Sequence, residues 1–157
     1  MAGNNRFFAR GGRPLMEKAD GTAGACVFIS HQHADRTLAS EVGNRLRELE
    51  VDIWLDAEDT ATLQAVESGD KRQLADAIEW GLTNCTHLLA LISPKTQGSW
   101  WVPYEIGSAR GRSKELAFFV HKDVGELPAY LTFWEEDFGS GRFLPVGDRG
   151  VFKQIPY

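Results

Sequence analysis

The sequence predicts an α/β protein with a flavodoxin-like, three-layer arrangement: a parallel five-stranded sheet with helices on both faces. Short, continuously apolar segments alternate with segments whose apolar residues recur at helical spacing, and this alternation occurs four times. Strands that are apolar throughout are typical of parallel sheets covered on both sides, and a repeated strand–helix order favours right-handed crossovers. The length of 157 residues fits one domain. We expect a flexible tail over residues 1–22 and the domain over 23–157.

The first strand–helix unit is predicted from residues 25–55. Residues 25–30 are apolar and form the first strand, which the polar residues His31–His33 end. Asp35 is placed to cap the following helix. Four apolar residues then recur at helical spacing: Leu38, Val42, Leu46 and Leu49. Residues 51–55 form the second strand.

The second unit begins with an acidic and polar segment over residues 56–70, which we interpret as a long functional loop. Asp70 is placed to cap the next helix. The apolar stripe of this helix is Leu74, Ile78 and Leu82. Residues 86–93 contain a third buried strand, and a turn follows it.

The third helix is predicted to begin near Ser99 and to end near Ser113. Pro103 is compatible with it because proline is tolerated in a first helical turn. Gly107 and Gly111 are expected to permit close packing of this helix. The fourth strand is predicted over residues 116–120.

The C-terminal part gives weaker signals. Residues 127–131 predict a short helix and residues 132–134 a fifth, edge strand. The segment from Phe138 is rich in glycine, and we assign it no structure.

The charge and composition of the chain argue against several classes of function. A net charge of -5 argues against nucleic acid as the main partner, because phosphate binding relies on clustered Lys and Arg. No apolar run is long enough for a membrane span. Cys26 and Cys85 lie in apolar surroundings and predict buried, inert thiols in a reducing cytoplasm. His33 and His87 have no partners at ligand spacing, so we predict no metal site.

Polar residues at the carboxyl ends of the predicted strands mark the expected ligand edge. They are Ser30, His31, Asp56 and Ser93. The helix after the third strand carries Trp101 and Glu105, which share one face because they are four residues apart. An apolar wall beside a carboxylate raises its pKa, as acid–base chemistry often needs. The alternative is a core tryptophan and a glutamate that interacts with the helix dipole.

Three segments together resemble the Toll/interleukin-receptor (TIR) domain family. Residues 27–31 read Val-Phe-Ile-Ser-His and precede Asp35, as in the first strand and loop of TIR domains. Residues 54–56 read Trp-Leu-Asp, as where the second strand enters the so-called BB loop. Residues 99–105 read Ser-Trp-Trp-Val-Pro-Tyr-Glu and match the Trp-x-x-x-Glu signature of the enzymatically active members. The resemblance covers roughly residues 24 to 135.

The resemblance implies an enzyme that cleaves the nicotinamide–ribose bond of NAD, with Glu105 as the catalytic carboxylate. NAD is then the substrate, and no cofactor is expected. The positions that match the pocket of such enzymes are Phe28, Ser30, His31, Trp54, Asp56, Ser93 and Trp101. Packing is the alternative for Phe28 and Trp54, a solvated loop residue for His31, and a turn cap for Ser93.

Stand-alone bacterial TIR proteins that this chain resembles act in Thoeris-like anti-phage defence. The resemblance therefore implies a product of the ADP-ribose or cyclic ADP-ribose type, a separate effector protein that responds to it, and self-association through TIR–TIR contacts. Two alternatives stay open. One is a non-enzymatic TIR adaptor, and the other is an enzyme similar to the nucleoside deoxyribosyltransferases, which also use a glutamate at a ribosyl centre.

Overall fold

The computed structural model describes residues 25–55 and 67–131, and the backbone of residues 143–146. Five strands form one sheet in the order β2-β1-β3-β4-β5, and the predicted α/β fold class is confirmed. The strands are β1 (Cys26–Ser30), β2 (Asp52–Trp54), β3 (His87–Ile92), β4 (Glu115–Val120) and β5 (Phe143–Val146). The helices are η2 (His33–Asp35), α1 (Arg36–Glu48), α3 (Lys71–Asn84), η4 (Thr96–Gly98) and α4 (Trp101–Gly111).

The first four strands run parallel, and the fifth is antiparallel. β1 pairs with β2 and β3, and β3 pairs with β4, all in parallel, whereas β5 pairs with β4 in the opposite direction. The sequence predicted a sheet that is parallel throughout, but the fifth strand runs antiparallel. The fifth strand lies in the glycine-rich segment that had received no assignment. The edge strand predicted at 132–134 lies outside the described residues.

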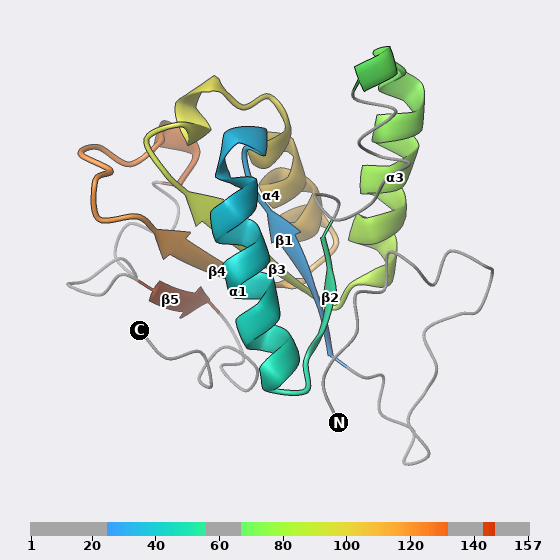
Figure 1. Ribbon diagram of the computed structural model, residues 1–157, viewed down its shortest axis with the longest axis horizontal. Helices are drawn as coiled ribbons and strands as arrows, with labels where there is room; N and C mark the ends of the chain where they lie inside the picture. Colours follow the sequence, from blue (N-terminus) through green and yellow to red (C-terminus); the bar gives the residue numbers. More distant parts are fainter. Residues whose placement is uncertain (1–24, 56–66, 132–142, 147–157) are drawn as a thin grey trace.

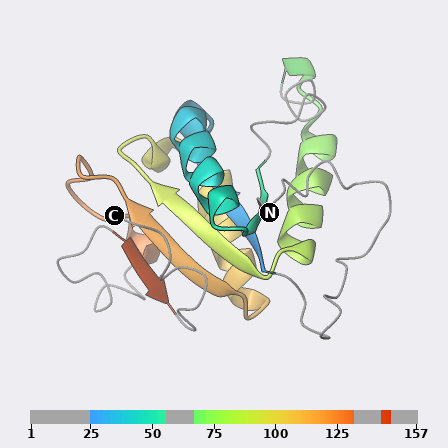
Figure 2. The ribbon, with the colours of Figure 1, turned by 60° about the horizontal axis from the view of Figure 1, so that its bottom comes forward.

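The side chains of the parallel strands alternate between two separate cores. The even-numbered residues, such as Phe28, Leu88 and Phe118, pack on one face against α3 and α4. The odd-numbered residues, such as Ile29 and Leu89, pack on the other face against α1. Figure 1 shows α1 in front of the sheet and α4 behind it, and Figure 2 shows the same layers after rotation. Because successive side chains in a strand point to opposite faces, the parity of a residue fixes its core.

The helices bury the stripes that their sequences predicted. In α1, Leu46 is fully buried, and Leu38, Val42 and Leu49 pack half-buried against the same core. In α3 the corresponding residues are Leu74, Ile78 and Leu82. The described residues form no helix with the length and apolar character that a membrane span requires.

The two predicted helix caps have different outcomes. Asp70 caps α3 as expected, since its carboxylate accepts a hydrogen bond from the backbone N–H of Gln73 at 3.0 Å. Asp35 stands at the N-cap of α1, but its side chain makes no capping bond there. The capping prediction for Asp35 was wrong because its carboxylate is turned toward the end of β3.

Both cysteines are buried, as the prediction of apolar surroundings indicated. Cys26 begins β1, Cys85 is the C-cap residue that follows α3, and their Sγ atoms are 3.1 Å apart. The contact joins the amino-terminal end of the sheet to the helix beside it.

Candidate active site at the carboxyl edge of the sheet

The strand order places a ligand edge between β1 and β3. In doubly wound sheets of this order, β1 and β3 are neighbours whose connections leave toward opposite faces, and ligands bind outside their carboxyl ends. Ser30 ends β1, and Ser93 follows the end of β3. Both serines are almost fully buried, with 1% and 6% of their surface exposed.

The two serines bond to two different carboxylates on the two sides of the sheet. Ser30 is even-numbered and points to the α4 side, where its hydroxyl donates to Glu105 Oε2 at 2.5 Å. Ser93 hydroxyl donates to Asp35 Oδ2, also at 2.5 Å, beside α1. The carboxyl edge therefore carries two hydroxyl–carboxylate pairs, one on the α4 side of the sheet and one on the α1 side.

Glu105 is the candidate for chemistry because it is buried where a carboxylate is costly. Only 5% of its surface is exposed, and it lies in the second turn of α4 among apolar neighbours such as Val102 and Ile106. Burial disfavours a charge unless hydrogen bonds stabilise it. The bond from Ser30 serves this purpose and fixes the direction of the carboxylate.

Trp101 lies on the same helix face as Glu105, as the four-residue spacing predicted. Its ring is half-buried against the α4-side core and meets Tyr104 edge-on, with ring centroids 5.9 Å apart. The Tyr104 hydroxyl donates to the carboxylate of Glu79 on α3, and this bond raises the pKa of Tyr104. These contacts hold the first turns of α4 against α3.

The start of α4 follows from local sequence. The Ser99 hydroxyl accepts a hydrogen bond from the Val102 N–H at 3.1 Å, and Pro103 occupies the first turn, where its missing N–H costs nothing. No capping side chain comes from Trp100, whose ring is 91% exposed.

Phe28 and Trp54 lie in the core beneath the site. Each is 1% exposed, and their rings stack with centroids 4.5 Å apart and planes 10° from parallel. Both residues therefore pack in the core, which is the alternative that the sequence left open. A contact of either ring with substrate stays a prediction.

The remaining predicted site residues are distributed around this edge. His31 is half-buried, and its Nδ1 lies 3.2 Å from the Ile29 carbonyl oxygen. Besides donating to Asp35, the Ser93 hydroxyl accepts a hydrogen bond from the Lys95 N–H at 3.0 Å, which fits the turn-capping alternative. Asp56 lies outside the described residues.

Sequence reasoning missed the second carboxylate pair. Asp35 is 7% exposed, and Lys95 Nζ lies 3.4 Å from its Oδ1. The available signal was that Asp35 and Ser93 follow neighbouring strands. The pairing of those strands, however, cannot be read from the positions of the two residues.

Comparison with known proteins identifies a family for this chain. A family model described as TIR domain matches residues 27–140. The search of curated proteins found no match.

Proposed function

Because the chain belongs to the TIR domain family, we propose that it cleaves NAD and that Glu105 is its catalytic carboxylate. The TIR family includes enzymes that cleave NAD as well as adaptors. The observation that carries the proposal is the buried Glu105 carboxylate, held by the Ser30 hydroxyl at the ligand edge of the sheet. Such a group is costly for stability and well suited to stabilising a developing positive charge.

The proposed reaction needs only one essential carboxylate. The bond between ribose C1′ and the nicotinamide nitrogen breaks, and its electron pair neutralises the cationic nicotinamide ring, so no strong acid is required. The ribose gains oxocarbenium character, as in glycoside hydrolysis, and the Glu105 carboxylate stabilises it. Water then attacks C1′ to give ADP-ribose, or a nitrogen of the same molecule attacks to give a cyclic product, and in either case the attacking group loses a proton to solvent.

The biological setting that we propose is bacterial anti-phage defence in the cytoplasm. There the nucleotide product would act on a separate effector protein. The support is the resemblance of the three sequence segments to stand-alone TIR proteins of Thoeris-like systems.

Glu105→Gln tests the assignment. The substitution keeps the size and one oxygen that can accept the Ser30 hydroxyl, but it removes the charge, so nicotinamide release from NAD should fall on the order of a hundredfold or more. Chromatography with mass spectrometry measures nicotinamide and identifies the ribosyl product. Glu48→Gln, on the exposed end of α1, is the matched control and should keep full activity.

The outcome depends on folded protein, so the thermal unfolding of both variants is compared with that of the wild type. A folded Glu105→Gln variant that still releases nicotinamide at a tenth of the wild-type rate would remove Glu105 from the chemistry.

A non-enzymatic adaptor is the second candidate, and one observation favours it. TIR domains associate through TIR–TIR contacts, and two large exposed aromatic residues lie at the start of α4: the N-cap residue Trp100 at 91% and Tyr104 at 47%. An adaptor would show no nicotinamide release from the wild type, while its self-association would be unchanged by Glu105→Gln.

A further inference from the structure

The two thiols of the chain meet at the amino-terminal edge of the sheet, the edge opposite Ser30. Cys26 is the first residue of β1, Cys85 follows the last residue of α3, and their Sγ atoms are 3.1 Å apart. The sulfur atoms of a disulfide bond are about 2.0 Å apart, so an approach of about 1 Å brings the pair to bonding distance. The sequence predicted inert thiols, because a spacing of 59 positions does not show that the two cysteines meet.

Backbone hydrogen bonds hold the two cysteines side by side. The Thr86 N–H donates to the Cys26 carbonyl oxygen at 3.0 Å, and the Cys26 N–H donates to the Thr86 hydroxyl at 2.9 Å. The Cys85 N–H donates to the Gly81 carbonyl oxygen at 3.0 Å, which fastens Cys85 to the last turn of α3. The backbone is therefore fixed on both sides of the sulfur contact, and the remaining approach is left to the side chains.

A positive charge lies beside this contact. Lys114 Nζ donates to the Cys85 carbonyl oxygen. Burial lowers the pKa of Lys114, whereas its electrostatic interactions with Cys85 and Cys26 raise that pKa. Because such an attraction is mutual, the Lys114 ammonium stabilises a thiolate here. The thiolate is the form of cysteine that reacts, and reactive cysteines lie next to positive charges.

We propose that Cys26 and Cys85 form a reversible disulfide bond when the protein meets a hydroperoxide. The chain has two cysteines, so this pair is the one intramolecular disulfide that it can form. Their exposed fractions of 1% and 3% favour a small, uncharged oxidant such as hydrogen peroxide over a bulky one such as oxidised glutathione. Disulfides of reducing compartments are usually transient and often sense oxidants. The inference does not rest on the proposed function, because the pair lies at the edge of the sheet away from Glu105.

The reaction transfers two electrons in two steps. The Cys85 thiolate attacks one oxygen of hydrogen peroxide, the O–O bond breaks, and hydroxide leaves and takes up the proton that the thiol had lost, so that Cys85 becomes a sulfenic acid. The Cys26 sulfur then attacks the Cys85 sulfur, the S–O bond breaks, and the leaving hydroxide takes the Cys26 proton. Two thiols thereby lose two electrons and two protons, and one peroxide becomes two molecules of water.

Mass spectrometry of the wild-type protein tests the bond directly. Folded full-length protein is treated with hydrogen peroxide, catalase and acid end the reaction, and the protein is digested without reduction. We expect the peptides of Cys26 and Cys85 to be joined, with a mass lower than their sum by two hydrogen atoms, and dithiothreitol should separate them. No joined peptide, a disulfide-linked dimer, or a joined peptide that appears only in urea would each overturn the proposal.

A comparison of oxidants tests the role of size. Oxidised glutathione at the same concentration should form the bond about tenfold more slowly than hydrogen peroxide, because it reaches buried sulfur atoms poorly. Equal rates for the two oxidants would overturn the assignment of a hydroperoxide.

The disulfide should also change thermal stability. It joins residues that are 59 positions apart, and a crosslink over such a loop restricts the unfolded chain. The oxidised protein should therefore melt about 5–10 °C higher than the reduced protein. One oxidised sample is measured before and after dithiothreitol, which reduces the disulfide but leaves oxidised methionine as it is. An oxidised form with an equal or lower melting temperature would overturn the proposal, because the native fold would then not accommodate the bond.

Variants assign the roles of the individual residues. Cys26→Ser removes the second sulfur, so peroxide should add oxygen atoms to Cys85 and no joined peptide should form. A Cys85 that stays a thiol in this variant would overturn the first step. Lys114→Gln keeps a donor for the Cys85 carbonyl oxygen but removes the charge, and it should slow disulfide formation about threefold to tenfold.

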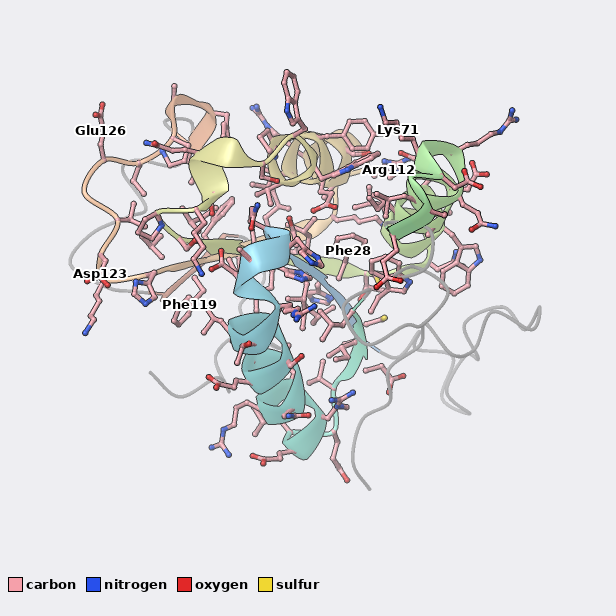
Figure 3. The ribbon with its side chains drawn as sticks, turned by 45° about the horizontal axis from the view of Figure 1, so that its top comes forward. Phe28, Lys71, Arg112, Phe119, Asp123 and Glu126 are labelled. Atoms are coloured by element: carbon pink, nitrogen blue, oxygen red, sulfur yellow. The ribbon has the colours of Figure 1, made fainter. Side chains whose placement is uncertain are left out.

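The matched control is Lys71→Gln. Lys71 is exposed at the opposite end of α3 from Cys85, where Figure 3 labels it, and its substitution should leave the rate of disulfide formation at the wild-type value. Equal rates for the Lys114 and Lys71 variants would overturn the assignment of Lys114 to this site.

Discussion

At the scale of single residues, Ser30 is a hydrogen-bond partner of the Glu105 carboxylate. Ser30→Ala removes the hydroxyl that donates to Oε2 at 2.5 Å, and a hydrogen bond to a charged group is worth about 1.5–3 kcal/mol. If this bond orients the carboxylate in the transition state, kcat/KM for NAD should fall about tenfold to a hundredfold. Steady-state kinetics measure this, with Ser40→Ala on α1 as the control.

The split between kinetic constants distinguishes orientation from folding. If Ser30 positions Glu105, Ser30→Ala lowers kcat although the variant still unfolds cooperatively when it is measured at the same protein concentration as the wild type. Unchanged kcat with lowered thermal stability would reduce Ser30 to a structural partner of Glu105.

At the scale of elements, the contact of α3 with the sheet depends on a residue without a side chain. A Cβ atom at Gly81 would lie 2.6 Å from Trp54 and 2.8 Å from Phe28, whereas a Cβ at Gly107 in α4 would meet no atom of the described residues within 4 Å. Gly81→Ala should therefore destabilise the protein by about 1–3 kcal/mol, through overpacking. Gly107→Ala should stabilise it by about 0.5–1 kcal/mol, since it improves helix propensity without a clash. Urea denaturation of the two variants measures both effects.

The same comparison corrects an expectation from sequence. Gly107 and Gly111 were expected to permit close packing of α4, but among the residues that the structure describes no atom lies within 4 Å of a Cβ placed at either position. Equal effects of the Gly81 and Gly107 substitutions on unfolding would contradict the packing described for α3.

At the scale of the whole molecule, self-association should influence activity. TIR domains associate with one another, and Trp100, the N-cap residue of the helix that carries Glu105, is 91% exposed. We expect nicotinamide release per subunit to rise with protein concentration, and Trp100→Ser to weaken that rise because it removes apolar contact area. Rates over a dilution series, with sedimentation at the same concentrations, measure this. A rate per subunit that is constant over the series, in protein that does associate, would contradict the prediction.

Much of the fold was predictable because apolar patterns are local. The runs in β1, β3 and β4 and the stripe in α1 follow directly from spacing along the chain. β5 was not predictable, because its direction depends on β4 and the sequence around it is rich in glycine. The cap expected at Asp35 failed for a similar reason, since its partner Ser93 is 58 positions away.

The candidate site was predictable only in part. Trp101 and Glu105 share a helix face by spacing alone, but the proximity of Glu105 to Ser30 spans 75 positions and depends on strand register. Before the structure, only the resemblance to TIR domains linked them. Lys95, His121 and Asp123 gave no sequence signal, because each looks like an ordinary surface residue until β3 and β4 place them around one groove beside the first turns of α1.

The contact between Cys26 and Cys85 has a practical consequence. Only 1% and 3% of their surfaces are exposed, so a thiol-alkylating reagent reaches them only when the start of β1 separates from the end of α3. The rate of alkylation in native buffer then reports how often this part of the core opens. Because β1 ends in Ser30, the alkylation rate of the natural cysteines also reports how often the strand that orients Glu105 opens.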